Sequence, residues 1–332
     1  MGYFLGVDLG GTKTHMVIAD EQGRAVGFGE SGGGNHQGVG YDGMYQALQA
    51  ALVDALQSAG LNKRDIIGAG YGIAGYDWLS EKESMVAVIE RLGLSASYDL
   101  MNDAIPGLVA GSEEGWGVGV VSGTGCNCRG WDRDHKREGR VTGYGLLMGE
   151  AAGGTELAYR AMQLVGFEWM RRGPKTALTQ MFIEYTGAKN LEDLLEGYTE
   201  DRYRVMANVA PLIFETARQG DVVAQDLIRW AGQELGEMAN SVIHQLEFER
   251  LEFDVVLSGS MFEGGSALID PMRETIGKVA AGARLVRLTI PPVLGAVLIG
   301  MEKGGVKSGP DVRKMLAEST QVVMGAEDVK KS

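Results

Sequence analysis

The chain has 332 residues, of which 45% are hydrophobic and 23% are charged, and a formal net charge of -13 at pH 7. This length exceeds the roughly 250 to 300 residues at which a single hydrophobic core stops growing, so two domains are expected. The acidic charge and the lack of a Lys/Arg cluster argue against binding to nucleic acid or to an anionic membrane, because both require a basic surface.

The cysteines and the N-terminal sequence narrow the class further. Cys126 and Cys128 are one residue apart, a spacing that suits neither a disulfide framework nor a four-ligand zinc site. We expect reduced thiols that pack beside a turn rather than nucleophiles. The sequence does not open with a basic segment, an apolar segment and a cleavage site, which predicts a cytoplasmic protein. The apolar run Leu288–Met301 is too short to span a membrane and is expected to form a buried loop and helix.

In chain order, the first half alternates between strand and helix patterns. The opening residues predict two strands joined by a turn, and helical spacing of three and four later ends at a glycine. The expected elements are strands within 5–20 and at 24–31, a helix at 38–60, a strand at 66–73, a helix at 80–93, a short strand at 97–103 and a helix near 104–111.

The second half, from Trp116, repeats the opening plan. Residues 117–132 predict an apolar strand that breaks at a Ser-Gly-Thr-Gly turn, a helical insert follows at about 150–247, and residues 253–265 predict a strand that ends in a glycine turn. This repetition predicts an α/β protein built from a duplicated unit with a cleft between the copies. We therefore expect an N-terminal domain at residues 1–115 and a C-terminal domain at residues 116–332 that carries the insert.

The segment Asp8–Thr14, DLGGTKT, has the composition of a phosphate-binding turn. It is not a Walker A loop, because Lys13 follows Thr12 and the chain continues as a strand rather than a helix. Paired glycines allow backbone N–H groups to approach phosphate oxygens, and a carboxylate at a strand end, Asp8, can hold Mg²⁺. An ordinary hairpin is the alternative for a single segment of this kind.

A second turn of the same composition, Ser122–Gly125, favours the phosphate-binding interpretation. Two glycine and threonine turns that end equivalent strands can hold one polyphosphate from both sides of a cleft. A competing motif, Gly70–Gly75, matches the G-x-G-x-x-G dinucleotide fingerprint. Its glycines lie inside an apolar strand pattern, and no strand with an acidic end follows about 20 residues later. We therefore do not expect a dinucleotide-binding fold.

Four segments, in order and spacing, resemble a known superfamily. DLGGTKT, Asn102-Asp103, SGTGCNCRG at 122–130 and LSGSMFEGG at 257–265 resemble the motifs of the actin/hexokinase/Hsp70 ATPases over nearly the whole chain. Within that superfamily the chain resembles the BadF/BadG/BcrA/BcrD group. GGGNH at 32–36 and GYGLLMGE at 143–150 favour its amino-sugar kinase branch. The resemblance implies two ribonuclease H-like domains, the cofactors ATP and Mg²⁺, a small sugar substrate, domain closure and a homodimer.

The resemblance also implies roles for individual residues. Asp103 is expected to be the base that accepts the proton of a sugar hydroxyl, the 6-OH, and Asp8 is expected to hold the metal. The nucleotide is expected at Gly10, Gly11, Thr12, Lys13, Thr14, Ser122, Gly123, Thr124, Gly125, Gly259 and Ser260, with help from a turn at Gly295. The sugar is expected at Asn35, His36, Gly75, Asn102, Asp103, Cys126, Asn127, Tyr144 and Glu150.

Several of these residues have simpler explanations, which the sequence leaves open. Asp103 precedes Ala-Ile-Pro and suits a helix N-cap, and Asn35 lies among glycines and suits a turn. His36 can shape a pocket or lie on the surface, and Glu150 can be a solvated charge.

The chain also departs from the family pattern on the sugar side. That pattern has serine at Cys126, tryptophan at Tyr144, aspartate at Glu150 and a serine near Ala74. Phosphoryl transfer is therefore better supported than the identity of the sugar. Two other functions stay open: an ATPase that drives a conformational change in a protein partner, and a nucleotide-regulated sugar sensor.

Overall fold

The computed structural model describes residues 2–331, which divide into two compact units. The first unit comprises Met1–Gly119, Trp131–Lys136 and Leu288–Ser332, and the second comprises Val120–Gly130 and Arg137–Arg287. Each unit is built around its own five-stranded sheet. The predicted α/β class with two similar halves is confirmed.

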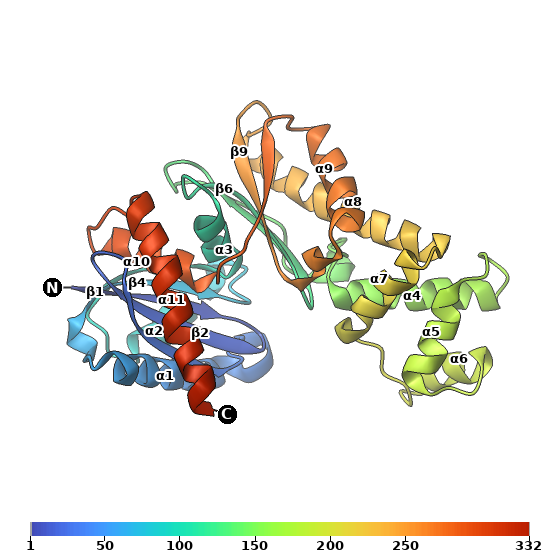
Figure 1. Cartoon of the computed structure of the whole chain (residues 1–332), viewed down its shortest axis with the longest axis horizontal. Coiled ribbons are helices and arrows are strands. Elements are labelled where there is room, and N and C mark those ends of the chain that lie inside the picture. The colour runs from blue at the N-terminus through green and yellow to red at the C-terminus, as the bar shows by residue number, and fades with distance from the viewer. Residues whose placement is uncertain (1, 332) are drawn as a thin grey trace. The chain divides into compact units, whose positions relative to one another are not determined.

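The sheet of the first unit has the strand order β3-β2-β1-β4-β5 (Figure 1). Strands β1, β2 and β3 form an antiparallel meander, whereas β4 and β5 run parallel to β1 because helices connect them. The strands are β1 (Tyr3–Leu9), β2 (Lys13–Asp20), β3 (Ala25–Gly32), β4 (Ile66–Ile73) and β5 (Ser97–Asn102).

Helices cover the sheet of the first unit and bury its apolar side chains. Helix α1 packs on β2 and β3, α10 packs on β1 and β4, and α11 packs along β3. The helices are α1 (His36–Ala59), α2 (Lys82–Glu90), α3 (Ala104–Gly111), α10 (Val293–Lys303) and α11 (Pro310–Lys331).

Two of the glycines that match the dinucleotide fingerprint, Gly70 and Gly72, belong to strand β4, and Gly75 follows the strand. A Cβ atom on Gly70 would lie 2.2 Å from the carbonyl oxygen of Ala296. The strand is therefore rich in glycine because helix α10 approaches its backbone closely. This packing confirms the interpretation of the motif as a strand rather than a nucleotide-binding turn.

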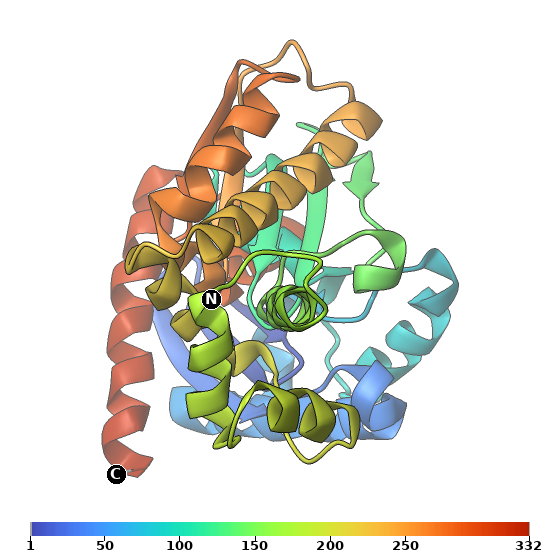
Figure 2. The ribbon, with the colours of Figure 1, turned by 90° about the vertical axis from the view of Figure 1, so that its right-hand side faces the viewer.

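The second unit has the strand order β10-β9-β6-β7-β8, and helices α8 and α9 pack side by side (Figures 1 and 2). Its strands are β6 (Gly117–Ser122), β7 (Cys126–Trp131), β8 (Glu138–Arg140), β9 (Phe253–Ser258) and β10 (Ala283–Arg287). Its helices are α4 (Gly154–Trp169), α5 (Ala177–Thr186), α6 (Leu191–Thr199), α7 (Ala210–Arg218), α8 (Val222–Leu246) and α9 (Ser266–Gly277).

The C-terminal segment departs from the expected domain division. Residues 288–332 were expected in the C-terminal domain, but Leu288–Ser332 belongs to the first unit. The physical reason is the apolar helix α10, which is buried over nearly its whole length against β1, β4 and α3. The boundary expected at residue 115 lies close to the end of the first segment at Gly119. In residues 2–331, none of the helices combines the length and apolar character of a membrane span.

Candidate active site

The first glycine turn connects β1 to β2 and leaves its tip exposed. Gly10 N–H donates to the Lys13 carbonyl at 2.8 Å, and Gly34 N–H donates to the Gly10 carbonyl at 3.1 Å. Gly11, Thr12 and Lys13 are exposed, and Lys13 Nζ lies 3.9 Å from Glu30 Oε2. The turn therefore presents backbone and an ammonium group to solvent, where they can reach a phosphate.

Thr14 has a different role from the rest of the turn. Its side chain is fully buried, and its Oγ1 donates to the Gly32 carbonyl at 2.9 Å. The hydroxyl therefore ties β2 to the end of β3. Thr14 supports the turn rather than presenting a hydroxyl to a nucleotide.

Two carboxylates lie at the ends of β1 and β5, the two strands that flank β4. Asp8 is near the end of β1 opposite Gly72 of β4, and Asp103 directly follows β5. Gly72 between them has no side chain. Burial, and to a smaller extent the charge of Asp103, together raise the pKa of Asp8 from 3.8 to about 7. Such a pair of oxygen ligands fits a hard divalent cation.

Asp103 occupies the N-cap position of α3 but does not cap it with its side chain. The neighbouring Asn102 does so, since its Oδ1 accepts a hydrogen bond from Ala104 N–H at 3.1 Å. Asp103 thus has the N-cap position that the simpler explanation expects, but Asn102 supplies the side-chain hydrogen bond. The proton-accepting role of Asp103 stays a prediction.

Asn35 begins helix α1, close to the segment that follows β4. Its Oδ1 accepts a hydrogen bond from Gln37 N–H at 2.9 Å, which makes it an N-cap. Gly75 has a left-handed φ of 81°, and a Cβ there would lie 2.4 Å from Asn35 Oδ1. The simpler explanation of Asn35 as a structural residue is thus consistent with its hydrogen bond to Gln37 N–H. The close approach of Gly75 restricts where the Asn35 side chain can lie.

The second glycine turn, between β6 and β7, is held by the segment at residues 152–155 that begins α4. Gly154 and Thr155 at the start of α4 donate N–H groups to the carbonyls of Gly123 and Thr124 at 2.8 and 2.9 Å. Ser122 is buried and its Oγ donates to the Ala152 carbonyl at 2.6 Å. Thr124 and Gly125 remain exposed. Ser122 therefore anchors the turn, while the next residues present its backbone.

Gly259 packs directly under this turn. It has a φ of 111°, and a Cβ would lie 2.2 Å from the Ser122 carbonyl oxygen. A side chain cannot be accommodated there without moving the turn. The predicted grouping of Ser122–Gly125 with the Gly259-Ser260 turn is thus present within one unit.

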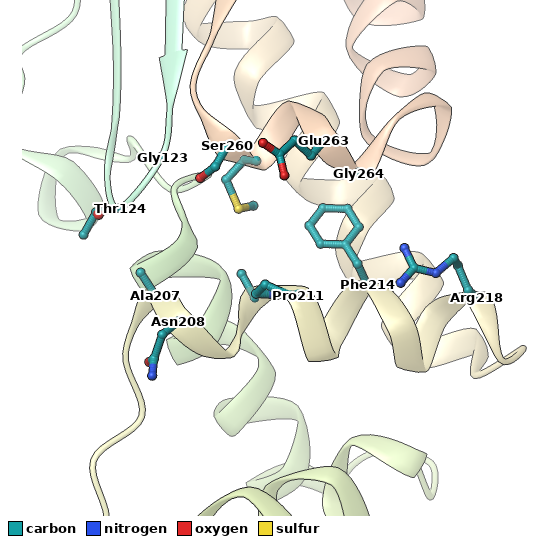
Figure 3. Close-up of a pocket in the computed structure, with 12 residues that line it drawn as sticks. Gly123, Thr124, Ala207, Asn208, Pro211, Phe214, Arg218, Ser260, Glu263 and Gly264 are labelled. Carbon is teal, nitrogen blue, oxygen red and sulfur yellow. The ribbon is translucent and has the colours of Figure 1, made fainter. Parts of the chain in front are cut away.

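A pocket of about 500 Å³ opens beside the second turn (Figure 3). The turn and the Ser260–Gly264 segment form one side, and helix α7 with the residues before it forms the other. Figure 3 shows the Phe214 ring facing the Gly264 segment, with Thr124 near one end and Arg218 near the other. The lining residues are Gly123, Thr124, Ala207, Asn208, Ala210, Pro211, Phe214, Arg218, Ser260, Met261, Glu263 and Gly264.

The sequence did not indicate the α7 wall of this pocket. Pro211, Phe214 and Arg218 lie within a helical pattern and carry no motif, and they are about 90 residues from the turn in the sequence. Their spacing of three and four places them along one face of α7. That periodicity is a weak local signal, and only the fold brings this face against Ser260 and Gly264.

Glu150 organises the loop at 142–149 of the second unit. It is 4% exposed, and its Oε1 accepts hydrogen bonds from Thr142 N–H and Oγ1, both at 2.6 Å, while Oε2 accepts from Gly145 N–H at 3.0 Å. The alternative that Glu150 is a solvated charge is wrong. Tyr144 of the same loop is 65% exposed and can meet a ligand.

Both cysteines are free thiols that pack beside the second turn. Burial raises the pKa of Cys126 to about 12 and also raises the pKa of Cys128. Cys126 Sγ accepts a hydrogen bond from Ala152 N–H at 3.4 Å, and Asn127 Oδ1 accepts one from Cys128 N–H at 2.8 Å. Thiols held neutral in this way are poor nucleophiles, which agrees with a packing role.

Gly295 does not form the turn that was expected at the nucleotide. It lies inside buried helix α10 of the first unit, where a Cβ would lie 1.9 Å from the Pro106 carbonyl oxygen. Its small size allows α10 to pack against α3, so the packing of the first unit explains it. Among residues 2–331, no group of three or more His, Cys, Asp or Glu side chains is arranged to hold a metal.

Two five-stranded units, each with a strand, a glycine turn and a second strand, define the actin-like ATPase fold. The chain belongs to the BadF/BadG/BcrA/BcrD ATPase family, whose model matches residues 5–300. The match covers both glycine turns, the carboxylate pair and all of the pocket-lining residues.

Curated relatives and solved structures match over similar lengths. The chain is 30% identical to N-acetyl-D-glucosamine kinase of Dictyostelium discoideum, covering 90% of this chain and 97% of the relative. It is 24% identical to N-acetylmuramic acid/N-acetylglucosamine kinase of Clostridium acetobutylicum, and the match covers 90% of this chain and 98% of the relative. A crystal structure from Chromobacterium violaceum, described as a candidate N-acetylglucosamine kinase, has a TM-score of 0.68 and 25% identity, covering 90% of this chain and 99% of that one.

Proposed function

We propose that this protein is an ATP-dependent kinase that transfers the γ-phosphoryl group to a hydroxyl of an amino sugar such as N-acetylglucosamine or glucosamine. The observation that carries the proposal is the pocket beside the second glycine turn, which combines exposed backbone with an apolar wall. The relatives named above act on N-acetylglucosamine by their names, which supports this acceptor class.

The second unit supplies the nucleotide site in this proposal. Its pocket of about 500 Å³ falls within the roughly 300 to 1,000 Å³ typical of small-molecule sites. Phe214, Pro211 and Met261 offer apolar contact area to a purine. The N–H groups of the exposed residues Thr124 and Gly125 suit phosphate oxygens, whereas Gly123 N–H donates to the Gly125 carbonyl at 2.9 Å. Nucleotide binding at this site therefore uses both stacking and backbone hydrogen bonds.

The first unit supplies the proton acceptor and the residues that would hold Mg²⁺. Asp103 accepts the proton of the attacking hydroxyl, and Asp8 holds the cation directly or through water. When bound, Mg²⁺ neutralises charge on the transferring phosphoryl group. Lys13 adds a positive charge near the first turn, and Asn35 and His36 lie on the acceptor side. Phosphoryl transfer needs positioning and charge neutralisation above all, which these groups can provide.

The proposal is tested by ADP release from MgATP with purified protein, with and without a panel of hexoses and amino sugars. We expect release that depends on one amino sugar, and we expect Asp103→Asn to abolish that dependence. Steady release that no sugar changes would refute the kinase and favour an ATPase that drives a protein partner.

The position of the phosphate on the product is a separate part of the proposal. Phosphorus-to-proton coupling in the NMR spectrum of the product is expected to connect the phosphate with the C6 methylene protons. Coupling to a ring proton would leave the kinase intact and refute 6-OH as the acceptor.

The homodimer is part of the same proposal and is tested by light scattering of the purified protein.

A further inference from the structure

A polar network in the first unit joins three segments that are far apart in the sequence. These are the start of α1 at Asn35–Gln37, the segment Gly75–Glu81 after β4, and Asn102–Ala104 after β5. The parallel pairing of β4 with β5 aligns Ile73 with Asn102, so the two later segments leave the sheet at the same edge. The contact of Gly75 with Asn35 brings α1 to that edge as well.

Asp77 is the centre of this network. The residue is 8% exposed, and its Oδ1 accepts a hydrogen bond from Asn102 Nδ2 at 3.2 Å. Its Oδ2 accepts from Gln37 Nε2 at 3.5 Å. Burying a carboxylate is costly unless hydrogen bonds compensate it, so this carboxylate must hold its partners to remain in place.

Glu81 fixes the backbone that carries Asp77. Its Oε2 accepts hydrogen bonds from Asp77 N–H at 2.9 Å and from Trp78 N–H at 2.8 Å. Its other oxygen, Oε1, lies 3.3 Å from His36 Nε2, and the His36 ring stacks on Tyr41 with centroids 4.9 Å apart. The segment after β4 is thus tied to helix α1 through a side chain at each end of the network.

Asn102 transmits these contacts to Asp103. Its Nδ2 donates to Asp77 Oδ1 and to the Tyr76 carbonyl, while its Oδ1 accepts from Ala104 N–H. The residue is 1% exposed. Both ends of its amide are therefore engaged, one with the β4 segment and the other with the first turn of α3. Asp103 follows Asn102 and precedes Ala104 in the chain, so the hydrogen bonds of these two neighbours hold its backbone on both sides.

We propose that Asp77 is a positioning residue for Asp103, acting through its hydrogen bond to Asn102. The inference rests on the proposed kinase function, because it assigns a role in the same reaction. Misplacing a reacting group by about 1 Å can lower a rate by about a hundredfold. Loss of the Asp77 contact is therefore expected to lower kcat and to leave the KM for MgATP nearly unchanged.

The test exchanges the donor and the acceptor of the Asp77–Asn102 bond. Asn102→Asp retains an oxygen for Ala104 N–H but removes the donor to Asp77 and places two carboxylates together. We expect its kcat to fall by at least about tenfold. Adding Asp77→Asn restores a donor and an acceptor in the reverse direction, so the double variant is expected to recover most of the lost kcat.

Three further variants complete the experiment. Asp77→Ala is expected to lower kcat by about tenfold to a hundredfold. Asp77→Asn alone keeps an oxygen that accepts from Asn102, so its kcat is expected to fall by less. Asp42→Ala is the matched control, because that carboxylate lies on α1, is 86% exposed and pairs with Arg91 on the surface. We expect the control to keep the wild-type kcat. Thermal unfolding of each variant reports whether it is folded.

The outcomes separate this inference from the proposed function. A wild-type protein without sugar-dependent ADP release would refute the kinase and this inference with it. An active wild type whose folded Asp77→Ala variant keeps kcat within about twofold would overturn the inference alone. If Asp77→Ala does not fold, the exchange pair decides: a double variant no better than Asn102→Asp would also overturn it.

Discussion

The two glycine turns have similar compositions and different surroundings. The Gly10–Lys13 turn of the first unit is closed mainly by its own backbone and follows Asp8, whose pKa the charge of Asp103 helps to raise. The turn at Ser122–Gly125 is supported by the start of α4 and by Gly259, and it borders a pocket to which Pro211, Phe214 and Met261 contribute apolar side chains.

This difference shows that a duplicated local structure acquires its chemistry from the segments that pack around it. Both turns expose backbone N–H groups that suit phosphate. A carboxylate pair beside one turn adds groups for a cation and a proton. An apolar wall beside the other turn adds contact area for the purine ring of a nucleotide.

The largest effect is expected on the side of the carboxylate pair. Asp103→Ala removes the proposed base and should lower kcat by at least about a hundredfold, the low end for a positioned base. Because the pocket lies in the second unit, the Kd for ATP should stay close to that of the wild type. Steady-state kinetics and calorimetric titration with ATP measure the two quantities. Near-normal turnover would remove Asp103 from the mechanism.

The two turns should differ clearly in their tolerance of a methyl group. Gly259→Ala introduces a side chain at a φ of 111° against the Ser122 carbonyl, and we expect it to lower the free energy of unfolding by about 2 kcal/mol. A Cβ on Gly11 meets no atom within 4 Å, so Gly11→Ala should leave stability unchanged and raise the KM for MgATP.

Chemical denaturation and kinetics of this pair test the comparison directly. Equal stability of the two variants would show that Gly259 does not support its turn. An unchanged KM for MgATP in Gly11→Ala would show that the first turn is an ordinary hairpin.

The apolar wall that includes Phe214 should affect the KM for MgATP and not the KM for the sugar. Phe214→Ala removes an aromatic ring from the pocket, and loss of a stacking contact worth about 1 kcal/mol should raise the KM for MgATP by about fivefold to tenfold. The KM for the sugar should not change. A matching increase in the KM for the sugar would place the acceptor in this pocket.

A further effect is expected in the pH dependence of stability without metal. The pKa of Asp8 is raised from 3.8 to about 7, so the folded protein binds this proton more tightly than the unfolded chain does. Stability should therefore fall as pH rises from about 4 through 7 and then level off. Asp8→Asn removes this loss.

The measurement is the melting temperature of both proteins in EDTA between pH 5 and pH 8. The melting temperature of Asp8→Asn should rise relative to that of the wild type as pH rises. Parallel curves would show that Asp8 titrates normally, and Mg²⁺ that raises the melting temperature of both proteins equally would remove Asp8 from the metal site.

Much of the fold was predictable because its signals are local. Strand β4 and helix α3 were predicted with the bounds that the structure shows, since an apolar run between turn residues and a helix start are defined within a few residues. Strands β8 and β10 and helices α9 and α11 were not predicted. Their pairing or packing partners lie far away in the sequence, and their own patterns are weak.

The candidate site was predictable in part. Asp8, Asp103 and the two exposed turns carry recognisable composition, and the charge of Asp103 helps to raise the pKa of Asp8 in the structure. Thr14 and Ser122 were assigned to phosphate because hydroxyls beside glycines suit it, but in the structure their hydroxyls bond to backbone carbonyls. Burial decides between these uses of a hydroxyl, and burial depends on neighbouring segments.

Local patterns were enough to predict the two glycine turns, the strand that contains Asp8 and the family of the protein, because backbone geometry and short motifs require particular residues at neighbouring positions. Only the tertiary structure decided that α7 forms a wall of the pocket, that α10 belongs to the first unit, and that Asp77 holds Asn102. Each of these arrangements joins segments separated by many residues, and the free energy that selects them comes from packing and buried hydrogen bonds that no local pattern records.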